Sequence, residues 1–66
     1  MTPRQDAIIK ALSDGASKTG LEIAQATTFD IRDIVSDLHV MQDAGTVFLR
    51  NGFFRLSEHA KQEHTP

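Results

Sequence analysis

Residues 19–56, TGLEIAQATTFDIRDIVSDLHVMQDAGTVFLRNGFFRL, carry the signals that decide the fold. The stretch begins with a capping box, in which Thr19 caps a helix and Glu22 completes the motif three residues later. A short helix is therefore predicted over residues 20–26. In this helix, Leu21 and Ala24 are expected to face inward, and Ile23 is expected to lie at the edge of the inward face.

A longer helix is predicted after a tight turn at residues 27–29. Asp30 is a favourable N-cap for it, and Gly45 supplies the conformation that ends it. Between these two residues the apolar positions recur at the 3.6-residue spacing of an amphipathic helix. The positions on this stripe are Ile31, Ile34, Val35, Leu38 and Met41.

The last part of the stretch predicts a β-hairpin. Asn51-Gly52 is the preferred pair for a two-residue type I′ turn, and such a turn fixes which residues face each other across the strands. The expected pairs are Val47 with Leu56, Phe48 with Arg55, Leu49 with Phe54, and Arg50 with Phe53. Because side chains alternate between faces, one face is apolar and faces the core: Val47, Leu49, Phe54 and Leu56. The other face is aromatic and cationic: Phe48, Arg50, Phe53 and Arg55.

A further helix is predicted ahead of this stretch. Thr2 is its N-cap, Pro3 occupies its first position, and it is expected to run to about Asp14, before Gly15. Its apolar face comprises Ile8, Ile9 and Leu12. We predict one domain over residues 1–57 and a polar, disordered tail over residues 58–66.

Composition excludes several classes of function. The chain has 66 residues, no cysteine and a net charge of −2, from seven Lys and Arg against nine Asp and Glu. Without cysteine there is no thiolate zinc site, and the three histidines are not spaced as a ligand cluster, so no metal is expected. No apolar run is long enough to span a membrane or to direct export, and a cytoplasmic protein is expected. No catalytic set or glycine-rich phosphate loop can be assembled, so we expect no enzyme activity, cofactor or small-molecule substrate.

Residues 20–52 resemble the winged helix-turn-helix superfamily of small prokaryotic and phage regulators, and the resemblance rests on the segment GLEIAQATTFDIRDIVSDLHVMQDAGTV, residues 20–47. With the first helix included, the resemblance covers most of the chain. It implies a mainly helical α+β fold in which three helices precede a two-stranded wing. It also implies binding to double-stranded DNA by a transcription regulator, for which a homodimer is expected because one small module makes few contacts.

In the superfamily the third helix enters the major groove and the wing touches the neighbouring backbone or minor groove. Residues opposite the apolar stripe would then face the groove: Thr28, Arg32, Asp33, Ser36, Val40 and Asp43. Of these, Thr28, Arg32 and Ser36 are the base-reading candidates. Arg50 and Arg55 are the candidates for phosphate contacts from the wing, and Lys18 for a backbone contact from the loop before the second helix.

The charges of the third helix depart from this pattern. Four aspartates lie in or beside it against a single arginine: Asp30, Asp33, Asp37 and Asp43. The first two are explained by the helix N-terminus, whereas Asp37 and Asp43 are predicted to form a solvated or partner-facing surface. The alternative is therefore a protein-interaction module that uses Phe48, Phe53 and the acidic helix. A third interpretation, in which the arginine stems merely cover the phenyl rings, also stays open.

Overall fold

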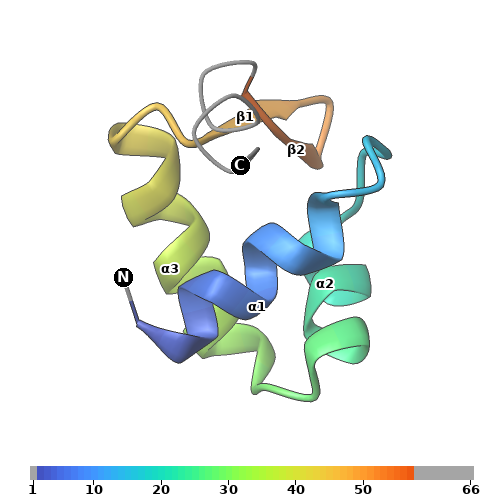
Figure 1. Ribbon diagram of the computed structural model, residues 1–66, viewed down its shortest axis with the longest axis vertical. Helices are drawn as coiled ribbons and strands as arrows, with labels where there is room; N and C mark the ends of the chain where they lie inside the picture. Colours follow the sequence, from blue (N-terminus) through green and yellow to red (C-terminus); the bar gives the residue numbers. More distant parts are fainter. Residues whose placement is uncertain (1, 58–66) are drawn as a thin grey trace.

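A computed structural model describes residues 2–57 as three helices followed by a two-stranded antiparallel sheet. The helices are α1 (Pro3–Leu12), α2 (Gly20–Thr27) and α3 (Ile31–Asp43), and the strands are β1 (Val47–Arg50) and β2 (Phe53–Leu56). In Figure 1, α1 lies in front between α3 and α2, and the hairpin lies above all three helices. The predicted order of elements is confirmed, whereas the predicted tail, residues 58–66, lies outside the described residues.

Capping by short polar side chains sets where each helix begins. Thr2 and Thr19 each form a complete capping box, and the Asp30 carboxylate accepts a hydrogen bond from the Arg32 backbone N–H at 2.8 Å. All three predicted N-caps are confirmed. Helix α1 ends at Leu12, two residues before the predicted end. Beyond it, Asp14 accepts a hydrogen bond from the Ala16 N–H, so its side chain bonds the backbone of the loop.

The inward face of α2 differs from the prediction. Ile23 is fully buried and Leu21 is 57% exposed, so the predicted places of these two side chains were wrong. Gly20 explains the orientation of the helix, because a Cβ on this residue would lie 3.4 Å from the Val35 side chain of α3. The face against α3 therefore starts at Gly20 and continues through Ile23 and Ala24, at the i, i+3, i+4 spacing of one helical face. Leu21 lies a third of a turn away from that face.

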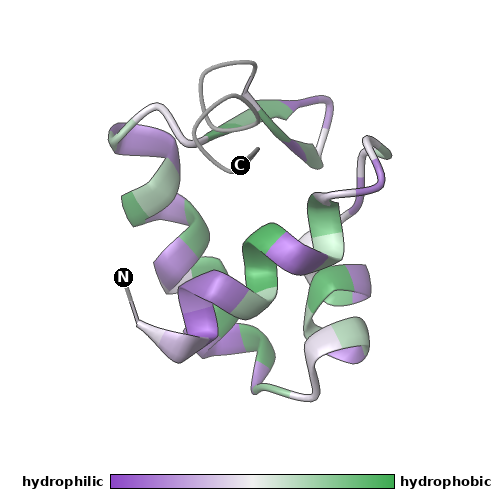
Figure 2. Cartoon of the chain, viewed as in Figure 1, coloured by the Kyte–Doolittle hydropathy of each residue, from purple (hydrophilic) through white to green (hydrophobic). Residues whose placement is uncertain are grey.

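The amphipathic stripe of α3 is confirmed at its centre. Ile34, Leu38 and Met41 are buried, whereas Ile31 at the start of the helix remains exposed. Together with apolar side chains from α1 and the hairpin they form one core. Figure 2 shows that each helix carries both hydrophobic and hydrophilic segments, as expected for elements packed around a single core.

The hairpin has the predicted register in all four pairs. Asn51 and Gly52 have φ values of 52° and 84°, as a type I′ turn requires. Val47, Phe54 and Leu56 are buried on the core face, but Leu49 is exposed, contrary to its predicted place in the core. Leu49 lies closer to the turn than Val47 does, where it pairs with Phe54 of the opposing strand.

A third segment pairs with the hairpin, which the sequence did not indicate. Lys18, in the loop between α1 and α2, exchanges two backbone hydrogen bonds with Phe54, of 2.9 and 2.7 Å. This bridge attaches the outer edge of β2 to the helical part of the molecule. The hairpin is therefore held in place by its core face and by one of its edges.

Candidate nucleic-acid interface

The outer face of α3 has the exposure that a recognition helix needs. Arg32, Ser36 and Val40 are all exposed, as predicted from their positions opposite the apolar stripe. The Arg32 side chain is 89% exposed, and its Nε lies 3.4 Å from the Asp30 carboxylate. An ion pair this exposed is weak, so the guanidinium can exchange Asp30 for another anion.

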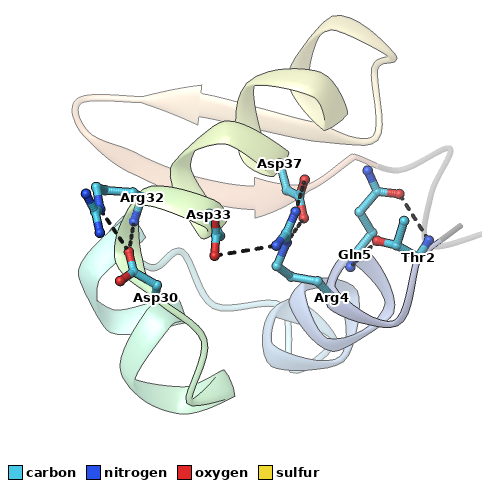
Figure 3. A network of polar contacts seen from close by, with 7 residues as sticks. All are labelled: Thr2, Arg4, Gln5, Asp30, Arg32, Asp33 and Asp37. Carbon is cyan, nitrogen blue, oxygen red and sulfur yellow. Dashed lines mark hydrogen bonds and ion pairs between the residues drawn. The ribbon is translucent and has the colours of Figure 1, made fainter.

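Asp37 corrects the prediction of a solvated acidic surface. It is only 7% exposed, and its carboxylate accepts hydrogen bonds from Nε and Nη2 of Arg4, at 2.5 and 3.3 Å. Figure 3 shows the Arg4 side chain extending from α1 towards Asp37, with Asp33 on its other side at 3.6 Å. The hydrogen bond to Asp37 is the main reason that the pKa of Arg4 is raised above its ordinary value.

Arg4 was not among the predicted functional residues, because its partner lies 33 positions away. A signal was nevertheless present in the sequence. Arg4 precedes Ile8 by four residues on α1, and Asp37 falls between Ile34 and Leu38 on α3, so both occupy positions of the buried stripes. Two opposite charges at inward positions of two packed helices are expected to pair, because an unpaired buried charge is unfavourable.

Lys18 is less available than predicted. Its Nζ donates to the Ala11 carbonyl at 2.9 Å and to both carboxylate oxygens of Asp14, at 3.1 and 3.0 Å. The pKa of Asp14 is lowered, first by the hydrogen bond from the Ala16 backbone N–H and then by the one from Lys18. The Lys18 ammonium thus already has three acceptors, and a phosphate would have to replace Asp14 to bind it.

Thr28 ends α2 in a left-handed conformation, with φ of 64°. Its backbone N–H donates to the Ala24 carbonyl, and its hydroxyl donates to the Thr27 carbonyl at 2.6 Å. The residue is exposed at the turn between α2 and α3. Its hydroxyl oxygen can still accept a hydrogen bond from a ligand, whereas its proton is used within the turn.

The outer face of the hairpin gathers the remaining predicted residues. Phe48 and Phe53 are 51% and 45% exposed, and Arg50 and Arg55 lie opposite them across the strands. Neither arginine forms an ion pair with any residue of the range 2–57. These four side chains line an open groove of about 540 Å³, to which Ser17 and Asn51 contribute polar groups. We call it the wing groove.

Among residues 2–57, the side chains that line the wing groove are cationic or neutral, and none of them is a carboxylate. The position of Ser17 follows from the bridge between Lys18 and Phe54, which places Ser17 opposite Arg55 at the outer edge of β2. The groove therefore offers guanidinium, amide and hydroxyl donors next to two aromatic rings. This combination suits an anionic ligand that also has a flat apolar part.

Comparison with known proteins gives a match at the level of structure. No protein-family model and no curated protein matches the sequence. A solved structure described as ligand-free NadR superposes with a TM-score of 0.85 at 19% sequence identity. The chain has a winged-helix fold. The match covers 94% of this chain and 47% of the NadR chain, so the chain spans about half the length of that protein.

The elements of the winged helix can now be assigned. Helices α2 and α3 with the turn between them form the helix-turn-helix, and β1 and β2 form the wing. None of the helices within residues 2–57 is long and apolar enough to cross a membrane. Over the same range, no three side chains of the kinds that bind metals come together to hold an ion.

Proposed function

We propose that this chain is a DNA-binding transcription regulator or coregulator of bacterial or phage type, which docks α3 and the wing against double-stranded DNA. The role is non-enzymatic, needs no cofactor and is exercised in the cytoplasm. A homodimer would double the small contact area of one module. The fold supports this proposal because the winged helix-turn-helix superfamily, which the sequence resembles, uses these two elements at DNA.

One observation supports the proposal most strongly, namely how charge is distributed between α3 and the wing. Arg4 neutralises Asp37 and keeps it away from solvent, which removes one of the two aspartates that argued against docking. Arg50 and Arg55 remain exposed and free of ion pairs within the described part of the chain. The net charge of −2 therefore conceals a local cationic surface on the wing.

Each residue has a distinct part in this proposal. Arg50 and Arg55 contact phosphates, which fixes the position of the domain on the duplex. Arg32 and Ser36 are the base-reading residues, since arginine pairs with guanine and serine accepts several partners. Thr28 offers an acceptor at the start of α3. Lys18 is a secondary contact, because it must first leave Asp14.

The alternative function is a protein-interaction module. It is favoured by the exposure of Phe48 and Phe53, because interface cores are enriched in phenylalanine and arginine. The partner would be a protein that covers the wing groove, with the remaining acidic residues of α3 as a second contact. The two functions differ in their dependence on salt, because DNA binding releases counterions and an apolar interface does not.

Removing a wing arginine is the direct test. In Arg50→Gln and Arg55→Gln, we expect weaker duplex binding. We also expect the slope of the logarithm of the binding constant against the logarithm of the salt concentration to decrease in magnitude by about one in each variant, since one phosphate contact is lost. Fluorescence anisotropy with a labelled mixed-sequence duplex, repeated from low to physiological salt, measures both quantities. Lys10→Gln is the matched control, because Lys10 is an exposed cation on α1 that does not line the wing groove.

The control separates a local contact from a general charge effect. Equal losses in the wing variants and in Lys10→Gln would mean that the wing makes no specific contact with phosphate. Binding that does not change with salt in the wild-type protein would contradict the DNA proposal and favour a protein partner.

A further inference from the structure

The aromatic and cationic side chains of the wing groove are arranged in a regular pattern. Phenylalanine and arginine alternate both along the strands and across them, because Phe48 faces Arg55 and Arg50 faces Phe53. The two phenyl rings are therefore diagonal neighbours on one face. The apolar core lies on the opposite face of the hairpin, so neither ring is needed to fill it.

The diagonal spacing suits a flat ring. Diagonal neighbours on adjacent strands lie about 7–8 Å apart. An aromatic ring held between two others needs about 7 Å, twice the ~3.5 Å contact distance of carbon atoms. A base can therefore fit between Phe48 and Phe53 when their two rings face each other across this spacing. Both rings line the wing groove, which has a volume of about 540 Å³.

The polar lining suits the rest of a nucleotide. Arg50 and Arg55 flank the two rings and carry no ion pair within residues 2–57, so they are free to bind phosphates on either side of a base. Asn51 at the turn can donate to a base edge and accept from it. In the described part of the chain, none of the residues that line the groove is a carboxylate that would repel a phosphate.

We infer that the wing groove binds an unstacked base, so that this protein prefers DNA with locally unpaired nucleotides over an intact duplex. In an intact duplex each base face is covered by its neighbours, and the phenyl rings would have nothing to stack on. Aromatic stacking platforms beside cationic side chains are a general means of binding single strands. The inference rests on the proposed function in one respect, that the wing faces nucleic acid.

The test compares three labelled oligonucleotides by fluorescence anisotropy: a matched duplex, the same duplex with a central three-nucleotide bulge, and one of its single strands. We expect the bulged duplex to bind at least about fivefold more tightly than the matched one, since stacking on one base contributes a factor of about five to more than a hundred. Phe48→Leu and Phe53→Leu should remove this preference, because leucine retains apolar area and lacks the ring.

Phe29→Leu is the matched control, because Phe29 is also exposed but lies in the turn between α2 and α3. It should leave the ratio of bulged to matched affinity unchanged. The affinity for both oligonucleotides can change together, because Phe29 lies within the proposed docking face of residues 28–36. Amide NMR spectra of all three variants should match the wild-type spectrum outside the altered site, which establishes that each one folds.

The outcomes separate this inference from the proposed function. Equal binding of matched and bulged duplexes, unaffected by the wing substitutions, would overturn the inference and leave the DNA proposal intact. A preference for the bulge that is lost in Phe29→Leu as well would also overturn it. No binding to any of the three oligonucleotides would overturn both proposals and leave the wing groove to a protein partner.

Discussion

Asp37 shows how a single residue changes the interpretation of a surface. It lies among buried apolar side chains on the inner side of α3, and both of its carboxylate oxygens accept hydrogen bonds from Arg4. A carboxylate in such surroundings is unfavourable unless a cation balances it. The pair therefore joins α1 to α3 and leaves Asp37 out of the exposed surface of α3.

Removing one partner of this pair should lower the thermal stability of the protein more than removing both partners does. In Arg4→Met, Asp37 keeps its charge without a partner, and we expect a clear fall in the thermal midpoint of unfolding. In the double variant Arg4→Met, Asp37→Leu, we expect part of the loss to be regained, because no unpaired charge remains. Thermal unfolding followed by circular dichroism measures both.

Arg32→Met is the control for this comparison, because its ion pair with Asp30 is exposed and should contribute little to stability. A double variant that unfolds at a lower temperature than Arg4→Met would contradict the account of the pair.

At the scale of the element, α2 owes its orientation to its smallest residue. Gly20 lies against Val35 and Leu38 of α3, which brings the two helices close together and turns Ile23 into the core. Leu21 is as hydrophobic as Ile23, and a hydrophobicity pattern within eight residues does not decide between the two. The close approach of α3 decides it, and that contact is not visible in the sequence of α2 alone.

This orientation of α2 predicts that two substitutions of apolar residues change the free energy of unfolding by different amounts. Ile23→Val should reduce the free energy of unfolding by about 0.5–1.5 kcal/mol, since it removes a buried methylene. Leu21→Ala should change it by less than about 0.5 kcal/mol, because the side chain is largely exposed and alanine favours the helix. Urea denaturation measures both, and a larger loss in Leu21→Ala would mean that α2 is rotated from the orientation described.

Local signals explain why so much of the fold could be predicted. The hairpin register follows from the Asn51-Gly52 turn, and the starts of the helices follow from Thr2, Thr19 and Asp30, so each depends on residues close together in the chain. The features that were missed link distant segments. Lys18 pairs with Phe54, and no local sequence signal indicates that contact. Arg4 pairs with Asp37, and the only signal for it is that both charges occupy inward positions of their helices, which becomes useful once the helices are known to pack together.

The same distinction between local and distant contacts applies to the candidate site. The aromatic-cationic face of the wing follows from the register, whereas the availability of each cation depends on distant contacts. Sequence reasoning treated Lys18 as free and Asp37 as solvated, and it overlooked Arg4. Which charges remain unpaired on the surface is a property of the packed molecule.

For the whole molecule, the net charge is a poor guide to what the surface can bind. Within residues 2–57, Arg4 pairs with Asp37 and Lys18 pairs with Asp14, whereas Arg50 and Arg55 of the wing form no ion pair. Attraction to phosphate is therefore expected to be local and strongly dependent on salt. The central claim is that the wing and α3 together form one surface that docks on DNA.

An NMR titration of labelled protein with a mixed-sequence duplex, at low and then at physiological salt, tests this claim most directly. We expect shifts concentrated on residues 28–36 and 48–55, which diminish as salt rises. Amides of α1 around Lys10 should stay unchanged and serve as the internal control. Shifts absent even at low salt, or spread evenly over the molecule, would contradict the claim.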